Sequence, residues 1–337
     1  MTDHEFRVGP ALRRVLARPG GAELLDALAS ELSGADLTTL LLEVFRRRAD
    51  RLTPADVVRR YRSDRFVTPA PIELAALRHA EDTLLAALPD GFETLVLAPL
   101  LPLAAHSAVA SVDPRKVVAT IRGSEVAADP TNALALEAAV RRSRMLAVDP
   151  RSAAPVRLAA SQRVVRAQHF DAPGMLAHFQ LFAMVSAGRD TGNRAFEHQH
   201  LTEHLQFIAR ALSMIGAEPA ELRLTCLEEA SIPLLERARA VLAGTPGINV
   251  LDDRERMTGR GYYTQLCFKL YATIAGQCVE VADGGFVDWT RQLTGNHKER
   301  LLISGFGVDR LAATPTPPTS SKTGPRQKIR DHAPSAD

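Results

Sequence analysis

Three stretches in the last third of the chain decide the fold: Gly259-Arg-Gly-Tyr-Tyr-Thr-Gln-Leu-Cys-Phe-Lys-Leu-Tyr271, Asp283-Gly-Gly-Phe-Val-Asp-Trp289 and Ser304-Gly-Phe-Gly-Val-Asp-Arg-Leu311. Strand-like segments over 262–273 and 279–282 follow one another in hairpin-like succession, and Gly307 opens a last helix or turn. Strands grouped in this way, with helical segments around them, predict an α+β fold with a mostly antiparallel sheet. No GxGxxG or Walker A stretch occurs, so a Rossmann or P-loop fold has no support.

The composition is ordinary for a globular protein. The 337 residues are 46% apolar and 24% charged, and the net charge of +2 gives no electrostatic case for nucleic-acid binding. The three cysteines, Cys226, Cys267 and Cys278, are too few and too scattered for a disulfide framework or a CxxC metal site. No apolar run reaches the roughly 18 residues of a membrane span, and the chain begins without an apolar signal region. We therefore expect a cytoplasmic protein with no membrane contact.

Residues 1–66 form a predicted N-terminal helical unit. Apolar residues recur there at helical spacing, and Thr53-Pro-Ala-Asp56 is typical of a helix start, with the helix running through Tyr61. Seven arginines make the unit locally basic: Arg46, Arg47, Arg48, Arg51, Arg59, Arg60 and Arg62. They mark either solvated helix faces or a docking surface for an acidic partner.

The core is predicted to span residues 67–312, and residues 313–337, rich in Pro, Thr, Ser and charge, form a predicted disordered tail. Within the core, helices are expected over 72–88, from the capping residue Asp129 to about Arg142, and over 194–215 and 232–242. Further strands are expected over 92–97, 117–121, 164–168, 179–185, 222–225 and at Val250, with a loop at Asp171-Ala-Pro-Gly174.

The three opening stretches, in this order and spacing, resemble the C-terminal half of a class II aminoacyl-tRNA synthetase core of the histidyl type. The resemblance covers roughly residues 72–311. It implies a mostly antiparallel sheet flanked by helices that holds ATP and a small amino acid. Gly91-Phe-Glu-Thr-Leu-Val-Leu-Ala-Pro99 resembles the first class II motif, which implies a homodimer.

Two further motifs imply a nucleotide site. Val165-Arg-Ala-Gln168 resembles the second motif, so Arg166 would hold the ATP α-phosphate, since a guanidinium fork fits phosphate oxygens. His178 and Phe182 match the returning strand, which would bring His178 near the distal phosphates. Gly305-Phe-Gly-Val-Asp-Arg310 resembles the third motif, with Arg310 over the nucleotide and Gly305 and Gly307 allowing close backbone approach. Mg²⁺ would bridge the phosphates. The alternatives are a surface strand arginine and a glycine-rich turn.

The implied amino-acid pocket keeps some family residues and loses others. Tyr262 and Tyr263 match the histidyl-type Tyr-Tyr-Thr stretch, but the family's catalytic arginine falls on Thr258. Arg260, offset by two and so on the same face of an extended strand, is a candidate substitute. Four more residues would line the pocket: Gly284, Gly285, Asp288 and Gln168. Thr131 replaces the glutamate that binds the substrate amine, so plain histidine would bind poorly.

The resemblance implies activation of an amino acid or related carboxylate as its adenylate, with transfer to a non-tRNA acceptor. Canonical tRNA charging is not expected, because no anticodon-binding domain follows Arg310 and the stretch before Val250 is too short for the usual insertion domain. The alternative is a non-catalytic amino-acid-sensing subunit, similar to the regulatory subunit of ATP phosphoribosyltransferase, which the loss of the catalytic arginine favours. A protein partner or acceptor would dock on the N-terminal helices.

A different class of function is suggested by His200-Leu-Thr-Glu-His204. Residues four apart share a helix face, so His200 and His204 would bind one Zn²⁺ with Glu203 as the base of a zinc hydrolase. The other interpretation is a polar helix face with buried His–Glu hydrogen bonds. Outside this alternative no dedicated metal site is expected.

Overall fold

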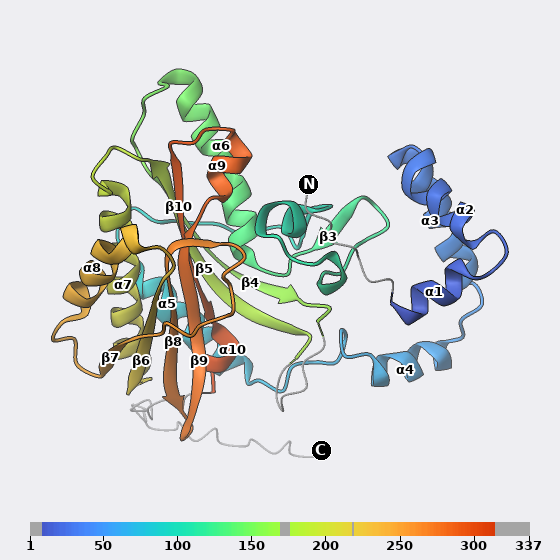
Figure 1. The fold of residues 1–337 in the computed structure, drawn as a ribbon. Helices are drawn as coiled ribbons and strands as arrows, with labels where there is room; N and C mark the ends of the chain where they lie inside the picture. Colours follow the sequence, from blue (N-terminus) through green and yellow to red (C-terminus); the bar gives the residue numbers. More distant parts are fainter. Residues whose placement is uncertain (1–8, 169–175, 218, 314–337) are drawn as a thin grey trace, which may run out of the picture.

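The computed structural model describes residues 9–168, 176–217 and 219–313 (Figure 1). Its centre is an eight-stranded sheet in the order β1-β4-β5-β10-β9-β8-β6-β7. The strands are β1 (Glu93–Thr94), β4 (Val156–Val165), β5 (His178–Arg189), β6 (Ala220–Cys226), β7 (Ile248–Asp252), β8 (Tyr263–Ile274), β9 (Gln277–Val287) and β10 (Glu299–Gly307). All neighbours are antiparallel except β1–β4 and β6–β7, which confirms the predicted α+β class with a mostly antiparallel sheet. The predicted loop at 171–174 and the tail beyond Ala313 lie outside the described residues.

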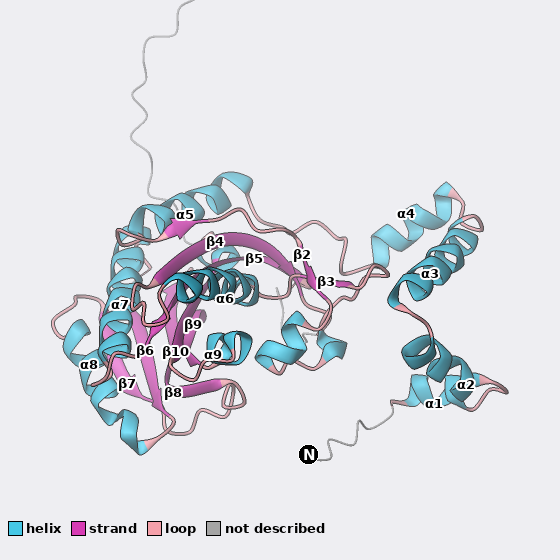
Figure 2. Ribbon diagram, turned by 90° about the horizontal axis from the view of Figure 1, so that it is seen from above, coloured by secondary structure: helices cyan, strands magenta, loops and turns pink. Residues whose placement is uncertain are grey.

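Helices cover both faces of the sheet. On one face lie α5 (Leu74–Ala87), α7 (Ala195–Ile215) and α8 (Ile232–Leu242), and on the concave face lie α6 (Pro130–Val148) and α9 (Trp289–Thr294), as Figure 2 shows. Alternate residues of each strand point to opposite faces, so the sheet is buried on both sides. A short helix, α10 (Val308–Leu311), follows β10, and β2 (Leu100–Pro102) pairs with β3 (Ser124–Val126) beside the main sheet. None of the described helices is long and apolar enough to cross a membrane.

Capping residues explain where several helices begin. Asp129 accepts the Thr131 N–H at 2.9 Å ahead of Pro130, as predicted, and α6 continues to Val148, past the expected end. Thr53 and Asp56 form a reciprocal capping box at the start of α4 (Pro54–Ser63).

Some strand predictions were wrong. β4 begins at Val156, eight residues before the predicted strand, because Ala159 and Ala160 bury both faces and remove the alternation that marks a half-exposed strand. Residues 117–121 form no strand and make one isolated bridge, from Ala119 to Glu125. The predicted strand over 92–97 is reduced to β1.

The N-terminal helices lie to one side of the sheet body (Figures 1 and 2). They are α1 (Pro10–Leu16), α2 (Gly21–Asp26), α3 (Gly34–Ala49) and α4. In these helices only Gly21 is buried. Large apolar side chains are instead exposed along them: Leu12, Val15, Leu24, Leu25, Leu40, Leu42, Val44, Phe45, Val57, Val58 and Tyr61. This part of the chain therefore has little hydrophobic core of its own.

The histidines of α7 face different partners. His200 Nδ1 lies 2.8 Å from Glu203 Oε2, and both oxygens of that carboxylate accept hydrogen bonds from Arg157. His204 is fully buried, with Nε2 3.1 Å from Ser186 Oγ and Nδ1 2.6 Å from Ser304 Oγ.

Both ring nitrogens of His204 are committed to serine hydroxyls, so neither is free to ligate a metal. Among the described residues no group of three His, Cys, Asp or Glu side chains is arranged to hold a metal ion. These contacts argue against the zinc-hydrolase alternative, and the buried His–Glu hydrogen bond of the other interpretation is present.

Burial lowers the pKa of His204 to about 3, so its stabilising effect has a defined pH window. The unfolded chain takes up this proton near pH 6.5 and the folded chain does not, so stability is full above about pH 6.5 and falls as the pH drops toward 3. We expect the wild-type free energy of unfolding to fall by about 2 kcal/mol more than that of His204→Asn between pH 7 and pH 5, measured by urea unfolding. Equal losses in the two proteins would contradict this assignment.

A second buried group ties α6 to β10. The Arg142 guanidinium is fully buried, contacts both carboxylate oxygens of Glu299 at 2.7 and 2.9 Å, and also donates to backbone carbonyls. Removing one partner leaves an uncompensated buried charge, so Arg142→Met should cost about 3–5 kcal/mol in urea unfolding, and Arg142→Met/Glu299→Leu should recover most of that loss. The exposed Arg144→Met serves as the control, expected within about 0.5 kcal/mol of wild type. A double variant as unstable as the single one would count against the charge-pair explanation.

Candidate functional site

Small residues lie on the concave face of the sheet where β9 and β10 run side by side. Asp283 of β9 pairs with Gly305 of β10, whose other neighbour is Ala183 of β5. Asp283 and Val287 are an even number of residues apart on β9, so their side chains lie on the same face of the sheet. Val287 packs toward α6, which places the Asp283 carboxylate on the concave face. A Cβ added to Gly305 would meet nothing nearer than 3.8 Å. Small residues therefore leave room beside this carboxylate.

The guanidinium of Arg256 reaches Asp283 from the loop that precedes β8. Its Nη2 lies 3.0 and 3.2 Å from the two carboxylate oxygens, and its Nε donates to the Thr258 carbonyl at 2.8 Å. The side chain is only 1% exposed, yet Nη1 is buried without a hydrogen-bond partner. Burial raises the pKa of Asp283, and the nearby arginine partly offsets this.

An unpartnered N–H on a buried cation is costly, because the group has lost water and gained nothing in return. A carboxylate or phosphate oxygen placed at Nη1 of Arg256 would make a charge-assisted hydrogen bond. Gln162 of β4 lies on the same face of the sheet and repeats this feature: its Nε2 donates to the Ala98 carbonyl at 2.7 Å, while its buried Oε1 has no partner. The concave face thus carries one buried donor and one buried acceptor without a partner.

Aromatic rings flank the ion pair. The rings of Tyr262 and Tyr263 lie 4.4 Å apart, and the Tyr262 ring lies 6.1 Å from that of Trp289. Burial raises the pKa of both phenols, which therefore stay protonated and serve as hydrogen-bonding groups. Gly259 turns the chain at φ +80°, where an added Cβ would lie 2.9 Å from the Tyr263 ring.

A second ion pair lies at the N-terminus of α6. Arg166 donates through Nη2 to Asp129 at 3.1 Å and through Nε to the Ala128 carbonyl at 3.0 Å, and its guanidinium lies over the Phe179 ring. The hydroxyl of Thr131 donates to the same aspartate at 2.7 Å. Arg166 is about one-third exposed, so it is the more accessible of the two paired arginines.

A buried His–Glu pair supports this helix terminus. The Ala128 N–H donates to His106 Nε2 at 3.0 Å, which places the ring proton on Nδ1, 2.5 Å from Glu125. Glu125 also accepts the His106 backbone N–H. These contacts hold the backbone that receives Arg166.

Arg260, the candidate substitute for the missing family arginine, is held by backbone carbonyls. Its side chain donates to the backbone carbonyls of Arg254 and Arg256 and is exposed. The residues before β8 turn back on themselves, since Tyr263 N–H donates to the Gly259 carbonyl, so the parity expected of an extended strand does not apply. The arginine of this loop that contacts Asp283 is Arg256.

Three other predicted residues serve the packing of the sheet. Phe182 is fully buried on the opposite face, where it stacks on Phe207. A Cβ at Gly284 would meet the Phe268 ring at 2.4 Å, and one at Gly285 would meet Cys267 at 2.6 Å, so both glycines permit close strand packing. Asp288 stands at the start of α9 and accepts from Gln292 at 2.7 Å.

The remaining predicted site residues lie at or just beyond the ends of β4, β5 and β10. Arg310 is exposed and donates to the Glu280 carbonyl. Gly307 precedes it at the end of β10, with the Arg310 side chain beside it. Gln168 is exposed just beyond β4. His178, at the start of β5, binds Arg163 and the Thr68 carbonyl.

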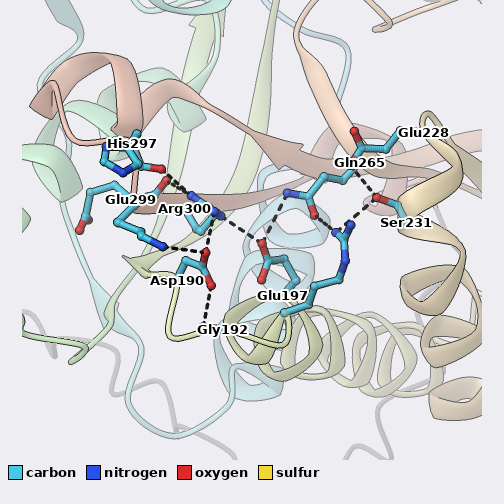
Figure 3. Close-up of polar contacts among 11 residues, drawn as sticks. Asp190, Gly192, Glu197, Glu228, Ser231, Gln265, His297, Glu299 and Arg300 are labelled. Carbon is cyan, nitrogen blue, oxygen red and sulfur yellow. Dashed lines mark hydrogen bonds and ion pairs between the residues drawn. The ribbon is translucent and has the colours of Figure 1, made fainter.

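A polar network at the start of β8 fixes the strand that follows the two tyrosines (Figure 3). Gln265 adopts φ +57° at a β-bulge, accepts from Arg194 at 3.1 Å, and its amide faces Glu197 at 3.5 Å. Arg300 bridges Glu197 and Asp190 at 3.2 and 2.9 Å. The network therefore holds the bulge, and with it the register in which Tyr263 pairs with β9.

Sequence reasoning missed Arg256 and Asp283. The signals were present, since Arg256 stands two residues before Thr258 and Asp283 directly precedes the Gly284-Gly285 pair. Neither residue type is informative alone, and only the turn at Gly259 brings them together.

No family model matches the chain, and no curated protein matches it. Solved structures are similar to it. An ATP phosphoribosyltransferase regulatory subunit/histidyl-tRNA synthetase from Bacillus halodurans matches 73% of this chain and 83% of its own, at 13% identity and a TM-score of 0.55. A histidine–tRNA ligase subunit from Alicyclobacillus acidocaldarius matches 73% and 94%, at 14% identity and a TM-score of 0.53.

Apo histidyl-tRNA synthetase from S. aureus matches 70% of this chain and 64% of its own length, at 15% identity and a TM-score of 0.52. Identities this low carry information about the fold alone. The chain has the class II synthetase-like fold that its sequence predicts, and the three solved structures named here are of the histidyl type.

Proposed function

We propose that the chain binds a small amino acid or related carboxylate with ATP, activates the carboxylate as its adenylate, and passes it to an acceptor other than a canonical tRNA. The observation that carries the proposal is the buried, unpartnered Nη1 of Arg256 beside Asp283. A donor of this kind, on the concave face of a class II synthetase-like sheet, supports a bound carboxylate or phosphate.

The ion pair suits a zwitterion. Arg256 and Asp283 together carry no net charge, so an added carboxylate is best accompanied by a cation on the same ligand. An α-amino acid supplies both: its carboxylate would accept from Nη1 and its ammonium would donate to Asp283. Tyr262 and Thr131 remain proposed pocket residues, as does Asp288.

The proposed nucleotide contacts are Arg166 and Arg310, with His178 toward the distal phosphates. Arg166 is now bonded to Asp129 and Arg310 to the Glu280 carbonyl, so ATP would have to exchange these partners for phosphate oxygens. Among the described residues no cluster of three acidic, His or Cys side chains is available for a metal. Mg²⁺ would therefore bind together with ATP, coordinated by its phosphates, rather than at a site made of protein ligands.

Formation of the adenylate requires positioning of the two reactants and neutralisation of charge. A carboxylate oxygen attacks the α-phosphorus, the bond from that phosphorus to the bridging oxygen breaks, and pyrophosphate leaves with the electron pair. No proton transfer is needed in this step. Arg256 and Arg166 would neutralise the charge that develops at phosphorus.

Amino-acid sensing without catalysis is the second candidate. Two of the proposed site arginines already have aspartate partners, Arg166 with Asp129 and Arg256 with Asp283, so this part of the site is near neutral while MgATP is strongly anionic. A neutral site favours a zwitterion over a nucleotide. One structural neighbour bears the name of a regulatory subunit, which agrees with this candidate.

The test is amino-acid-dependent exchange of labelled pyrophosphate into ATP, with Mg²⁺, across the standard amino acids and their deaminated analogues. Exchange with one carboxylate would support adenylation and name the substrate. Amino-acid binding by calorimetry without exchange would exclude adenylation and favour the sensing role.

Arg256→Lys tests the residue that carries the proposal. Lysine keeps the charge but loses the fork that contacts Asp283 and the ligand together, so we expect exchange to fall by about 100-fold, as for loss of one preorganised donor. Arg254→Lys, an exposed arginine in the same loop, is the matched control and should exchange like wild type. Exchange in Arg256→Lys within threefold of the control would remove Arg256 from the site.

A further inference from the structure

Residues 64–68 form a strap between α4 and the core, and the strap is pre-shaped by its own hydrogen bonds. The Asp64 side chain accepts the Phe66 N–H at 2.9 Å, and the Asp64 carbonyl accepts the Thr68 hydroxyl at 3.0 Å. The Arg65 guanidinium lies 4.3 Å from the centroid of the Phe66 ring. The turn thus presents one arginine and one carbonyl group toward the core.

Arg65 binds the end of β4. Its two terminal nitrogens donate to the carbonyls of Ala167 and Gln168, directly after Arg166. A planar fork that spans two successive carbonyls holds both the position and the direction of that backbone. The strap is therefore fastened to the segment that carries the proposed α-phosphate residue.

The strap also uses the last free N–H of His178. Arg163 donates to Nδ1 at 2.9 Å, so the ring proton is on Nε2, and Nε2 donates to the Thr68 carbonyl at 2.7 Å. No ring nitrogen of His178 is left to donate to a phosphate. Nucleotide contact at this residue and contact with the strap exclude one another.

We infer that the strap is autoinhibitory: while Arg65 and Thr68 hold the ends of β4 and β5, His178 is withheld from the distal phosphates of ATP. The inference rests on the proposed function, because it requires a nucleotide site at His178. Release of the strap would free the imidazole without changing the sheet.

The strap is built to open at low cost. None of its five residues is buried, and the helices before it expose most of their apolar side chains. Segments with few buried contacts open locally at a small fraction of the global unfolding free energy. A single substitution is therefore able to change the fraction of molecules in which the strap is closed.

The experiment compares full-length wild type with Arg65→Ala, and uses Arg62→Ala, an exposed arginine at the end of α4, as the matched control. Two readouts are taken: affinity for a fluorescent ATP analogue with Mg²⁺, and the rate at which diethyl pyrocarbonate modifies His178, scored by peptide mass spectrometry against the exposed His79. Arg65→Ala should bind the nucleotide about tenfold more tightly than wild type, and diethyl pyrocarbonate should modify its His178 several-fold faster. In the control, the nucleotide affinity and the modification rate should equal those of wild type.

Nucleotide binding that is unchanged or weaker in Arg65→Ala would overturn the inference, because the strap would then be neutral or supportive. Unchanged modification of His178 would overturn it as well. Absence of nucleotide binding in all three proteins is a different result: it would reject the ATP site itself, and with it the inhibitory role of the strap.

Discussion

The buried ion pair between Arg256 and Asp283 is the interaction on which the proposed site depends. It joins an irregular loop to the middle of β9, and so fixes where the two tyrosines at the start of β8 stand. A buried pair is seldom retained for stability, since desolvation offsets most of the attraction. This pair is also incomplete, because Nη1 lacks a partner. An incomplete, desolvated cation is more readily explained by a ligand than by folding.

The N-terminus of α6 supplies the second half of the site through a different device. Glu125 orients His106, His106 receives the Ala128 N–H, and the backbone so fixed receives Arg166 beside Asp129. The two halves share one electrostatic property, since each cation already has an anion. Binding of a polyanion would then require at least one pair to separate, whereas a zwitterion would leave both intact.

The sequence predicted the architecture better than the chemistry. The sheet, α7 and the capped starts of α4 and α6 follow from periodicity and local cap residues, which act within a few positions. β4 was largely missed because burial on both faces erases alternation. Arg256 was missed because the turn at Gly259 breaks the strand parity that favoured Arg260. Phe182 was misplaced because spacing along a strand does not tell which face a residue takes.

The N-terminal helices and the site are linked by the strap and not by a shared core. Helices that expose this much apolar surface are stabilised mainly by what they contact, so their position is sensitive to any partner that covers them. The strap links these helices to the ends of two strands through the direct hydrogen bonds of Arg65 and Thr68. Coupling of this kind needs only a two-state contact at His178. This coupling is compatible with an adenylating enzyme and with an amino-acid sensor. In both, binding of a partner to the N-terminal helices would change ligand binding at the site.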